Sequence, residues 1–287
     1  MQITTQRLGE HDFTVRAWGD PAHPMILMLH GFPEYGGAWE DIATRLSDRF
    51  YCVAPDQRGY GQSYAPDDIG AYATSKLVGD MVALIGDRAP VIVMGHDWGA
   101  SVAYGLAMFR PDLVSHLIIA NGVHPVPFQR AMAAGGAQSE ASQYINFLRS
   151  DGSEDALAEN DFAKLLKLFS AKMDMSWLAG DRLDAYKAVW RQSGLRGMIH
   201  WYRASPLIVA DPGTPEEMPD LPLDRLMVRC PHLLIWADGD TALLPVSTEG
   251  LEAFAPDLTR ATVPGADHWV LHQKPDEVAR IVRDWLA

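Results

Sequence analysis

The most reactive arrangement in this sequence is the pentapeptide GHDWG at residues 95–99. An apolar run precedes it at residues 91–94, and small residues follow it at 100–107. The pattern predicts a strand, a tight turn and a helix, with Asp97 at the centre of a Gly-x-nucleophile-x-Gly turn. The flanking glycines leave room for the turn and for close packing of the helix. We therefore expect Asp97 to be a nucleophile.

An aspartate at this position narrows the chemistry. Its carboxylate is already charged at neutral pH, so it attacks without help from a base. Attack on an acyl group would give an anhydride, whereas attack on a saturated carbon with a leaving group gives an ester that water can hydrolyse. The expected substrates are therefore epoxides or alkyl halides. The alternative is an ordinary aspartate that caps the N–H groups at a helix start.

Two later segments could complete the site. The segment ADGD at residues 237–240 follows an apolar run, and one of its acids could orient a histidine. Asp240 is the expected acid, with Asp238 as the reserve. His268 lies in the segment GADHW, after the last expected strand and before the last helix. The chain order is then nucleophile Asp97, acid, histidine, and His268 would activate the water that hydrolyses the ester.

Two backbone N–H groups could stabilise the developing negative charge. The tetrapeptide HGFP at residues 30–33 ends an apolar run, and its glycine and proline could aim the N–H of Phe32 at an oxyanion. The N–H of Trp98, the residue after the nucleophile, is the second expected donor. The side chains of Phe32, Trp98 and Trp201 are expected to line an apolar substrate pocket.

Short apolar runs alternate with amphipathic stretches in the first half of the chain and again near its end. This alternation predicts an α/β fold, with a mostly parallel sheet and helices on both faces. The expected strands lie at residues 13–18, 25–30, 51–54, 91–94, 113–120, 233–236 and 258–263. The expected helices lie at residues 38–48, 74–87, 100–109, 246–254 and from 275 onward.

The middle of the chain has a different character. Helical spacing dominates from residue 125, Met, Trp and Tyr are plentiful, and a Pro-rich stretch at 206–222 excludes a helix interior there. We therefore expect a core of residues 1–124 and 226–287, interrupted by a helical cap at 125–225. The cap would lie over the carboxyl ends of the strands, where open α/β sheets bind ligands.

Composition excludes several kinds of partner. The chain has 287 residues, 48% of them hydrophobic, and a formal net charge of −13. Without clustered Lys and Arg it should bind neither nucleic acid nor an anionic membrane surface. No window approaches the roughly 20 apolar residues of a membrane span, and the N-terminus lacks the apolar stretch of a signal peptide. Cys52 and Cys230 are expected to be free thiols, so we expect a cytoplasmic protein with no metal or organic cofactor.

Four segments resemble one family. HGFPE, DQRGYGQS, GHDWGA and DHWV, which begin at residues 30, 56, 95 and 267, are similar to segments of the α/β-hydrolase superfamily and, within it, of the epoxide hydrolases. The resemblance covers essentially the whole chain and implies an α/β-hydrolase fold with an inserted helical cap. It also implies two ring-opening tyrosines, which are Tyr144 in SQYINFL and Tyr202 in HWYRA. The implied activity is hydrolysis of a small apolar epoxide to a vicinal diol through a covalent ester on the nucleophile.

Two other functions stay open. A haloalkane or haloacid dehalogenase would use the same Asp97 nucleophile, with Trp98 as a donor to the departing halide, but it has no obvious use for two tyrosines. Fluoroacetate dehalogenases of the superfamily usually carry Arg directly after the nucleophile, where this chain has Trp98. The other alternative is a non-catalytic ligand-binding protein, because fold does not imply function. The oligomeric state is also open, a homodimer included, and we expect Asp56 and Arg58 to pair.

Overall fold

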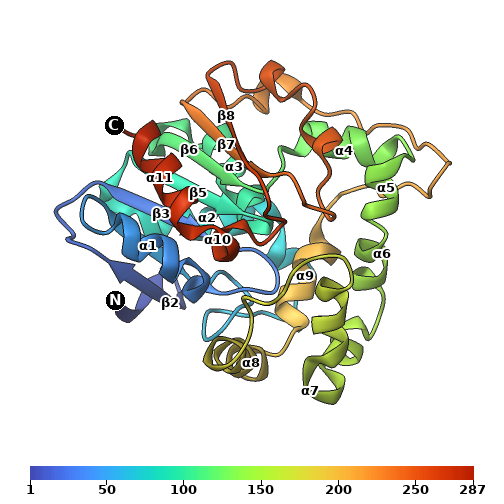
Figure 1. Ribbon diagram of the computed structural model, residues 1–287, viewed down its shortest axis with the longest axis horizontal. Helices are drawn as coiled ribbons and strands as arrows, with labels where there is room; N and C mark the ends of the chain where they lie inside the picture. The colour runs from blue at the N-terminus through green and yellow to red at the C-terminus, as the bar shows by residue number, and fades with distance from the viewer.

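A computed structural model describes the full chain, residues 1–287. Its centre is an eight-stranded sheet in the order β1-β2-β4-β3-β5-β6-β7-β8 (Figure 1). The pairs β1–β2 and β2–β4 are antiparallel, and all the others are parallel. The strands are β1 (Gln2–Leu8), β2 (His11–Trp18), β3 (Met25–Leu29), β4 (Tyr51–Pro55), β5 (Val91–His96), β6 (Val114–Ala120), β7 (His232–Ala237) and β8 (Leu258–Val263). The prediction of an α/β fold with a mostly parallel sheet is confirmed.

Helices cover both faces of the sheet (Figure 1). One face carries α2 (Thr74–Ile85) and α3 (Trp98–Phe109), and the other carries α1 (Glu40–Leu46) and α11 (Pro275–Trp285), which follows the short α10 (Val270–Gln273). Seven 3-10 helices join these elements: η1 (Gly36–Trp39), η2 (Ile69–Tyr72), η3 (Gly86–Arg88), η4 (Pro111–Leu113), η5 (Leu223–Arg225), η6 (Pro245–Thr248) and η7 (Leu251–Ala253). None of the helices has both the length and the apolar composition needed to cross a membrane.

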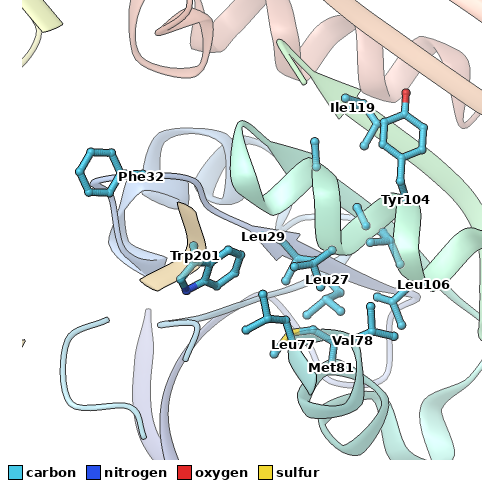
Figure 2. Close-up of a cluster of buried hydrophobic side chains, with 14 of the residues drawn as sticks. Leu27, Leu29, Phe32, Leu77, Val78, Met81, Tyr104, Leu106, Ile119 and Trp201 are labelled. Carbon is cyan, nitrogen blue, oxygen red and sulfur yellow. The ribbon is translucent and has the colours of Figure 1, made fainter. Parts of the chain in front are cut away.

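The central strands are apolar on both sides because helices cover both sides. Every residue of β3 is buried. Leu27 and Leu29 belong to the hydrophobic cluster on the side of α2 and α3, and Figure 2 shows them beside Leu77. Ile26 and Met28 point the other way, into the cluster formed with α1 and α11. The two-residue period of the strand therefore supplies both cores at once.

Between β6 and β7 the chain forms six helices and then a long segment without regular structure. The helices are α4 (Pro125–Ala133), α5 (Ala137–Ala141), α6 (Tyr144–Arg149), α7 (Ser153–Ser170), α8 (Asp181–Ser193) and α9 (Arg196–Ala204). Figure 1 shows them gathered at one end of the molecule, away from both chain ends. The segment 206–222 contains no helix, as its prolines predict.

The structure corrects the sequence prediction at two elements. The alternation of polar and apolar residues gave no expectation of β1, which is an edge strand with mostly exposed side chains. The helix expected at 246–254 is wrong, since two 3-10 helices, η6 and η7, replace it. Gly250 separates them with a φ of 76°, outside the helical region.

The expected pair between Asp56 and Arg58 is also wrong. Arg58 donates two hydrogen bonds to Asp80, at 2.6 and 2.8 Å. Asp56 instead forms a buried ion pair with Arg16 on β2. Each charge finds its partner on a different element, and the two pairs fix the loop after β4 to the sheet and to α2.

Candidate active site

Asp97 occupies the turn between β5 and α3, in a backbone conformation that side chains rarely adopt. Its φ is 50° and its ψ is −123°, a region that costs a residue other than glycine about 1–3 kcal/mol. The neighbouring glycines make the turn fit, because a Cβ on Gly95 would collide with the Gly99 carbonyl oxygen and one on Gly99 with the Leu29 carbonyl oxygen. The strained turn presents the carboxylate at the carboxyl end of the parallel strands.

The Asp97 carboxylate does not cap α3, so the capping alternative is wrong. Its Oδ1 accepts a hydrogen bond from the Phe32 N–H at 2.8 Å, and its Oδ2 lies 3.5 Å from His268 Nε2. Trp98 is the first residue of α3, where backbone N–H groups have no partner within the helix. One carboxylate oxygen therefore sits on a backbone donor, while the other faces the histidine.

Asp240 contacts the histidine and Asp238 does not. The Nδ1 of His268 donates to Asp240 Oδ2 at 2.8 Å. The other Asp240 oxygen accepts from the N–H groups of Ala242 and Leu243 at 2.8 and 2.9 Å. Asp238 is exposed, and its carboxylate accepts instead from a backbone N–H in the turn after β8. The structure thus brings together Asp97, His268 and Asp240 from three separate strand ends.

The charges in this group stabilise one another. Burial disfavours the charged form of His268, but Asp240 and Asp97 outweigh it and hold the pKa of His268 well above its ordinary value. Burial likewise works against the Asp97 carboxylate, yet the hydrogen bond and charge of His268 lower the pKa of Asp97. The same balance lowers the pKa of Asp240. His268 therefore carries its proton in the resting site, where it lies between two carboxylates.

Two tyrosines come from the helices between β6 and β7. Tyr144 begins α6 and Tyr202 lies near the end of α9, with 6.3 Å between their ring centroids. Burial, and then the Asp97 charge among the nearby groups, raises the pKa of both phenols. Both rings therefore keep their protons at neutral pH. Tyr202 also packs edge-on against Phe32 and Trp98, at 5.3 and 5.0 Å between centroids.

Two cavities meet at the nucleophile. One has a volume of about 290 Å³ and the other about 370 Å³, and Asp97, Tyr144 and Tyr202 line both of them. Phe32 and His268 face the smaller cavity, and Trp98 faces the larger one. Asp97, His268, both tyrosines, Phe32 and Trp98 thus lie around one place, with space for a ligand on either side of the carboxylate.

Trp201 lines neither cavity, so its expected place in the substrate pocket is corrected. Its side chain is 2% exposed, and Figure 2 shows it directed toward Leu29 rather than toward Phe32. Its indole N–H donates to the Arg58 carbonyl at 2.9 Å. Trp201 therefore fixes α9 to the core, one residue before the tyrosine that faces the cavity.

Arg149 fixes the C-terminal end of the same helix. Its guanidinium donates to the carbonyls of Tyr202, Leu207 and Ser205 at 3.0, 2.9 and 3.1 Å. The Tyr202 carbonyl also accepts from the Ser205 N–H at 3.3 Å, so Arg149 adds a second donor at the end of α9 and ties the following segment to it. Burial lowers the pKa of Arg149. No sequence motif points to this role, because the carbonyls that Arg149 binds lie more than fifty positions away.

Two amides also hold the site together, and sequence reasoning missed both. Asn121 follows β6, and its side chain donates to Asp240 Oδ2 at 2.8 Å and accepts from the Ala237 N–H. Gln138 on α5 donates to the Ala242 carbonyl and accepts from the Leu244 N–H. Asn121 and Gln138 both hold the loop that contains Asp240. Asn121 contacts it from the end of β6, and Gln138 contacts it from α5. A lone amide after a strand or in a helix carries no sequence signal for such a contact.

The strained turn, the acid and the histidine at the strand ends define a class of protein. The model of the alpha/beta hydrolase family matches residues 26–281, so the chain belongs to that family. It is 32% identical to the AB hydrolase superfamily protein YfhM of Bacillus subtilis, over 95% of this chain and 93% of that protein. It is 27% identical to epoxide hydrolase A of Mycobacterium tuberculosis, with 94% and 92% covered.

Solved structures give the narrower group. A structure described as one of the novel epoxide hydrolases from metagenomes of hot environments has a TM-score of 0.89 and 34% identity, over 100% of this chain and 98% of that one. The Bacillus megaterium epoxide hydrolase in complex with an inhibitor has a TM-score of 0.88 and 26% identity, with 99% of both chains covered. The chain is therefore a member of the epoxide hydrolase group, and the resemblance in its motifs is confirmed.

Proposed function

We propose that this enzyme hydrolyses small apolar epoxides to vicinal diols through a covalent ester on Asp97. The observation that carries the proposal is the position of two protonated phenols, Tyr144 and Tyr202, on the walls of both cavities that Asp97 lines. A carboxylate supplies the nucleophile, and the phenols supply the proton that an opening epoxide needs. The similarity to epoxide hydrolases supports the same assignment.

Ring opening is the first step. Asp97 Oδ2 attacks one ring carbon, the C–O bond to that carbon breaks, and the alkoxide takes a proton from a tyrosine. A phenol is ordinarily a far stronger acid than an alcohol, and the burial that raises the pKa of both tyrosines disfavours the charged alkoxide as well. Asp97 becomes a neutral ester in this step, so His268 loses one of the two charges that hold its proton. Its pKa falls, and its proton can return to the phenolate across the cavity that both line.

Ester hydrolysis is the second step. Neutral His268 takes a proton from water as the water oxygen attacks Asp97 Cγ, and the Oδ1 oxyanion develops on the Phe32 N–H, which already binds that atom. The Trp98 N–H is the expected second donor. The protonated histidine gives its proton to the departing diol oxygen. It then regains a proton from the new carboxylic acid, which restores the resting site.

Dehalogenation is the alternative with the same nucleophile. Displacing a halide also leaves an ester on Asp97, but the leaving group needs no proton. The two buried phenols would then have no chemical role, and for this reason we favour the epoxide. Halide release and diol formation can be measured side by side on matched substrates.

The source of the diol oxygen tests the covalent step. In water enriched in heavy oxygen, one turnover with excess enzyme should give unlabelled diol and leave the label in Asp97, as mass spectrometry of the protein would show. Asp97→Ala should abolish turnover, whereas the control Asp238→Asn should retain it, because Asp238 is exposed and does not touch His268. Label in the first-turnover diol would mean direct attack by water and would overturn the covalent mechanism.

A further inference from the structure

The two cavities differ in their walls and in their mouths. We call the larger one the apolar lobe; it is lined by side chains that include Phe109, Phe128, Leu207 and Leu221. Phe109 is 53% exposed, so the outer wall of this lobe is apolar even where it meets solvent. A chain of carbons or an aromatic ring is the occupant that such a wall favours.

The smaller cavity, which we call the charged-mouth lobe, lies on the histidine side of Asp97. Leu168, Phe169 and Met173 form apolar wall, and Glu140 and Lys172 are its two charged wall residues apart from the catalytic groups. Both of these charged side chains belong to exposed residues. An arm lying in this lobe therefore runs from an apolar interior to a charged rim.

The two lobes share only the reacting groups. Asp97, Tyr144 and Tyr202 are the residues common to both linings. An epoxide whose oxygen faces the tyrosines and whose ring carbon faces the carboxylate must sit at this junction. Trans substituents on its two carbons lie on opposite faces of the ring and point away from each other, so each can enter its own lobe. A terminal epoxide has one substituent and would leave one lobe without apolar contacts.

We infer that the preferred substrates are epoxides substituted on both ring carbons, with an apolar arm in the apolar lobe and a second arm in the charged-mouth lobe. The inference rests on the proposed epoxide hydrolysis and adds the substrate class to it. The lobe volumes of about 370 and 290 Å³ each approach the lower end of the range for small-molecule sites. Two arms of moderate size therefore fit this site better than one long arm.

Isomeric substrates test the inference on the unmodified enzyme. The compounds trans-5,6-epoxydecane and 1,2-epoxydecane have the same atoms and similar hydrophobicity, but the first has two butyl arms and the second has one octyl arm. The value of kcat/KM should be roughly tenfold or more higher for the internal epoxide, because only it fills both lobes. Equal or faster hydrolysis of the terminal isomer would refute the two-lobe inference and leave the proposed function standing. Hydrolysis of neither isomer would count against the proposed function itself.

Two variants then assign the arms. Leu207→Trp fills the apolar lobe and Ala141→Trp fills the charged-mouth lobe; both residues are only partly buried and can accept a larger ring. Each should lower kcat/KM for trans-5,6-epoxydecane by roughly tenfold. For 1,2-epoxydecane, Leu207→Trp should cause much the larger loss. The control Ala179→Trp, at an exposed residue outside both lobes, should change neither value. Equal losses for the two isomers in both variants would show that the lobes do not hold separate arms.

Discussion

At the scale of single residues, the proton on His268 is the quantity that changes during the proposed cycle. Two carboxylates hold the pKa of His268 well above its ordinary value in the resting site, against the effect of burial. A histidine that keeps its proton cannot act as a base. Esterification of Asp97 removes one of the two charges, so the base is created by the first step of the reaction. The pH profile of ester hydrolysis should therefore rise through a lower pKa than the free enzyme shows for the same histidine.

Replacing the histidine should separate the two steps. His268→Gln keeps a polar side chain beside Asp97 but cannot take a proton from water, so turnover should fall roughly 100- to 10,000-fold. Alkylation needs no base, and the ester should accumulate as a mass increase equal to that of the substrate. Intact-protein mass spectrometry after mixing with epoxide checks this. A variant that hydrolyses the epoxide at the normal rate would remove His268 from the mechanism.

The tyrosines make a prediction of their own. Tyr144→Phe and Tyr202→Phe should each raise the activation free energy of alkylation by about 3 kcal/mol, by analogy with the loss of one oxyanion donor. The alkylation rate should therefore fall roughly 100-fold. The double variant should be almost inactive, because no acid then remains for the alkoxide. Single-turnover kinetics give the alkylation rate directly. Tyr60→Phe is the matched control, since the Tyr60 hydroxyl is buried without a hydrogen-bond partner. Unchanged ring opening in both single variants would favour a dehalogenase.

The positions of Asp97 and His268 beside each other were predictable because each lies in a short motif with a fixed place relative to a strand. Asp240 was distinguishable from Asp238 only in part, by its distance from the strand end. Asn121 was not predictable as a partner of the acid, because the contact spans 119 positions. Trp201 was misplaced because it and its neighbour Tyr202 face different ways on α9, Trp201 toward the core and Tyr202 toward the cavities, and the sequence alone does not fix the helix rotation.

At the scale of elements, the position of α9 decides where Tyr202 lies. Trp201 fixes this helix to the core, and Arg149 binds three carbonyls at and beyond its end. The strongly periodic helices and the buried strands could be predicted from apolar spacing. The edge strand β1 could not, since its side chains are mostly exposed. The break at Gly250 could not be recognised either, because a single glycine is tolerated in many helices.

Removing the Arg149 guanidinium should slow ring opening, because Tyr202 would then be held less firmly. Arg149→Met keeps most of the side-chain volume but removes one hydrogen-bond donor from each of three carbonyls, so kcat for alkylation should fall roughly tenfold and stability by about 1–3 kcal/mol. The kinetic loss should largely vanish when it is measured in a Tyr202→Phe background, because Arg149 then has no acid to position. Arg110→Met, which breaks an exposed pair with Asp112, is the control. Equal kinetic losses in both backgrounds would show a purely structural role for Arg149.

At the scale of the whole molecule, one buried carboxylate joins the core to the helices above it. Glu34 follows β3 and is fully buried. Its Oε1 accepts from the Tyr186 hydroxyl of α8 at 3.0 Å and lies 2.6 Å from His272 Nε2 of α10. Its Oε2 lies 3.2 Å from His96 Nδ1 at the end of β5, and His96 Nε2 donates to the His268 carbonyl at 2.8 Å. The network therefore links α8 and α10, the sheet and the backbone of His268.

Burial disfavours the Glu34 carboxylate, but His272 and His96 outweigh it and lower the pKa of Glu34 well below its ordinary value of 4.5. A carboxylate whose pKa is lower in the folded than in the unfolded state stabilises the fold at any pH above its unfolded-state pKa. This contribution is lost as the pH falls through its folded-state pKa. Glu34→Gln should therefore destabilise the enzyme by about 3 kcal/mol at neutral pH, because it breaks a buried ionic contact. The fall in Tm should be roughly 5–10 °C.

The difference in Tm between wild type and Glu34→Gln should have its largest value above about pH 5. It should shrink in more acidic solution, because the wild-type carboxylate takes up its proton there. Thermal melts of both proteins across this range check the sign as well as the size. Glu249→Gln, at an exposed position, controls for the loss of one negative charge and should show no such trend. A Tm difference that stays constant into acid would mean that Glu34 acts through its shape and hydrogen bonds and not through its charge.

Because Tyr186 of α8 donates to Glu34, the Glu34→Gln variant should also expose α8 to proteolysis before the sheet unfolds.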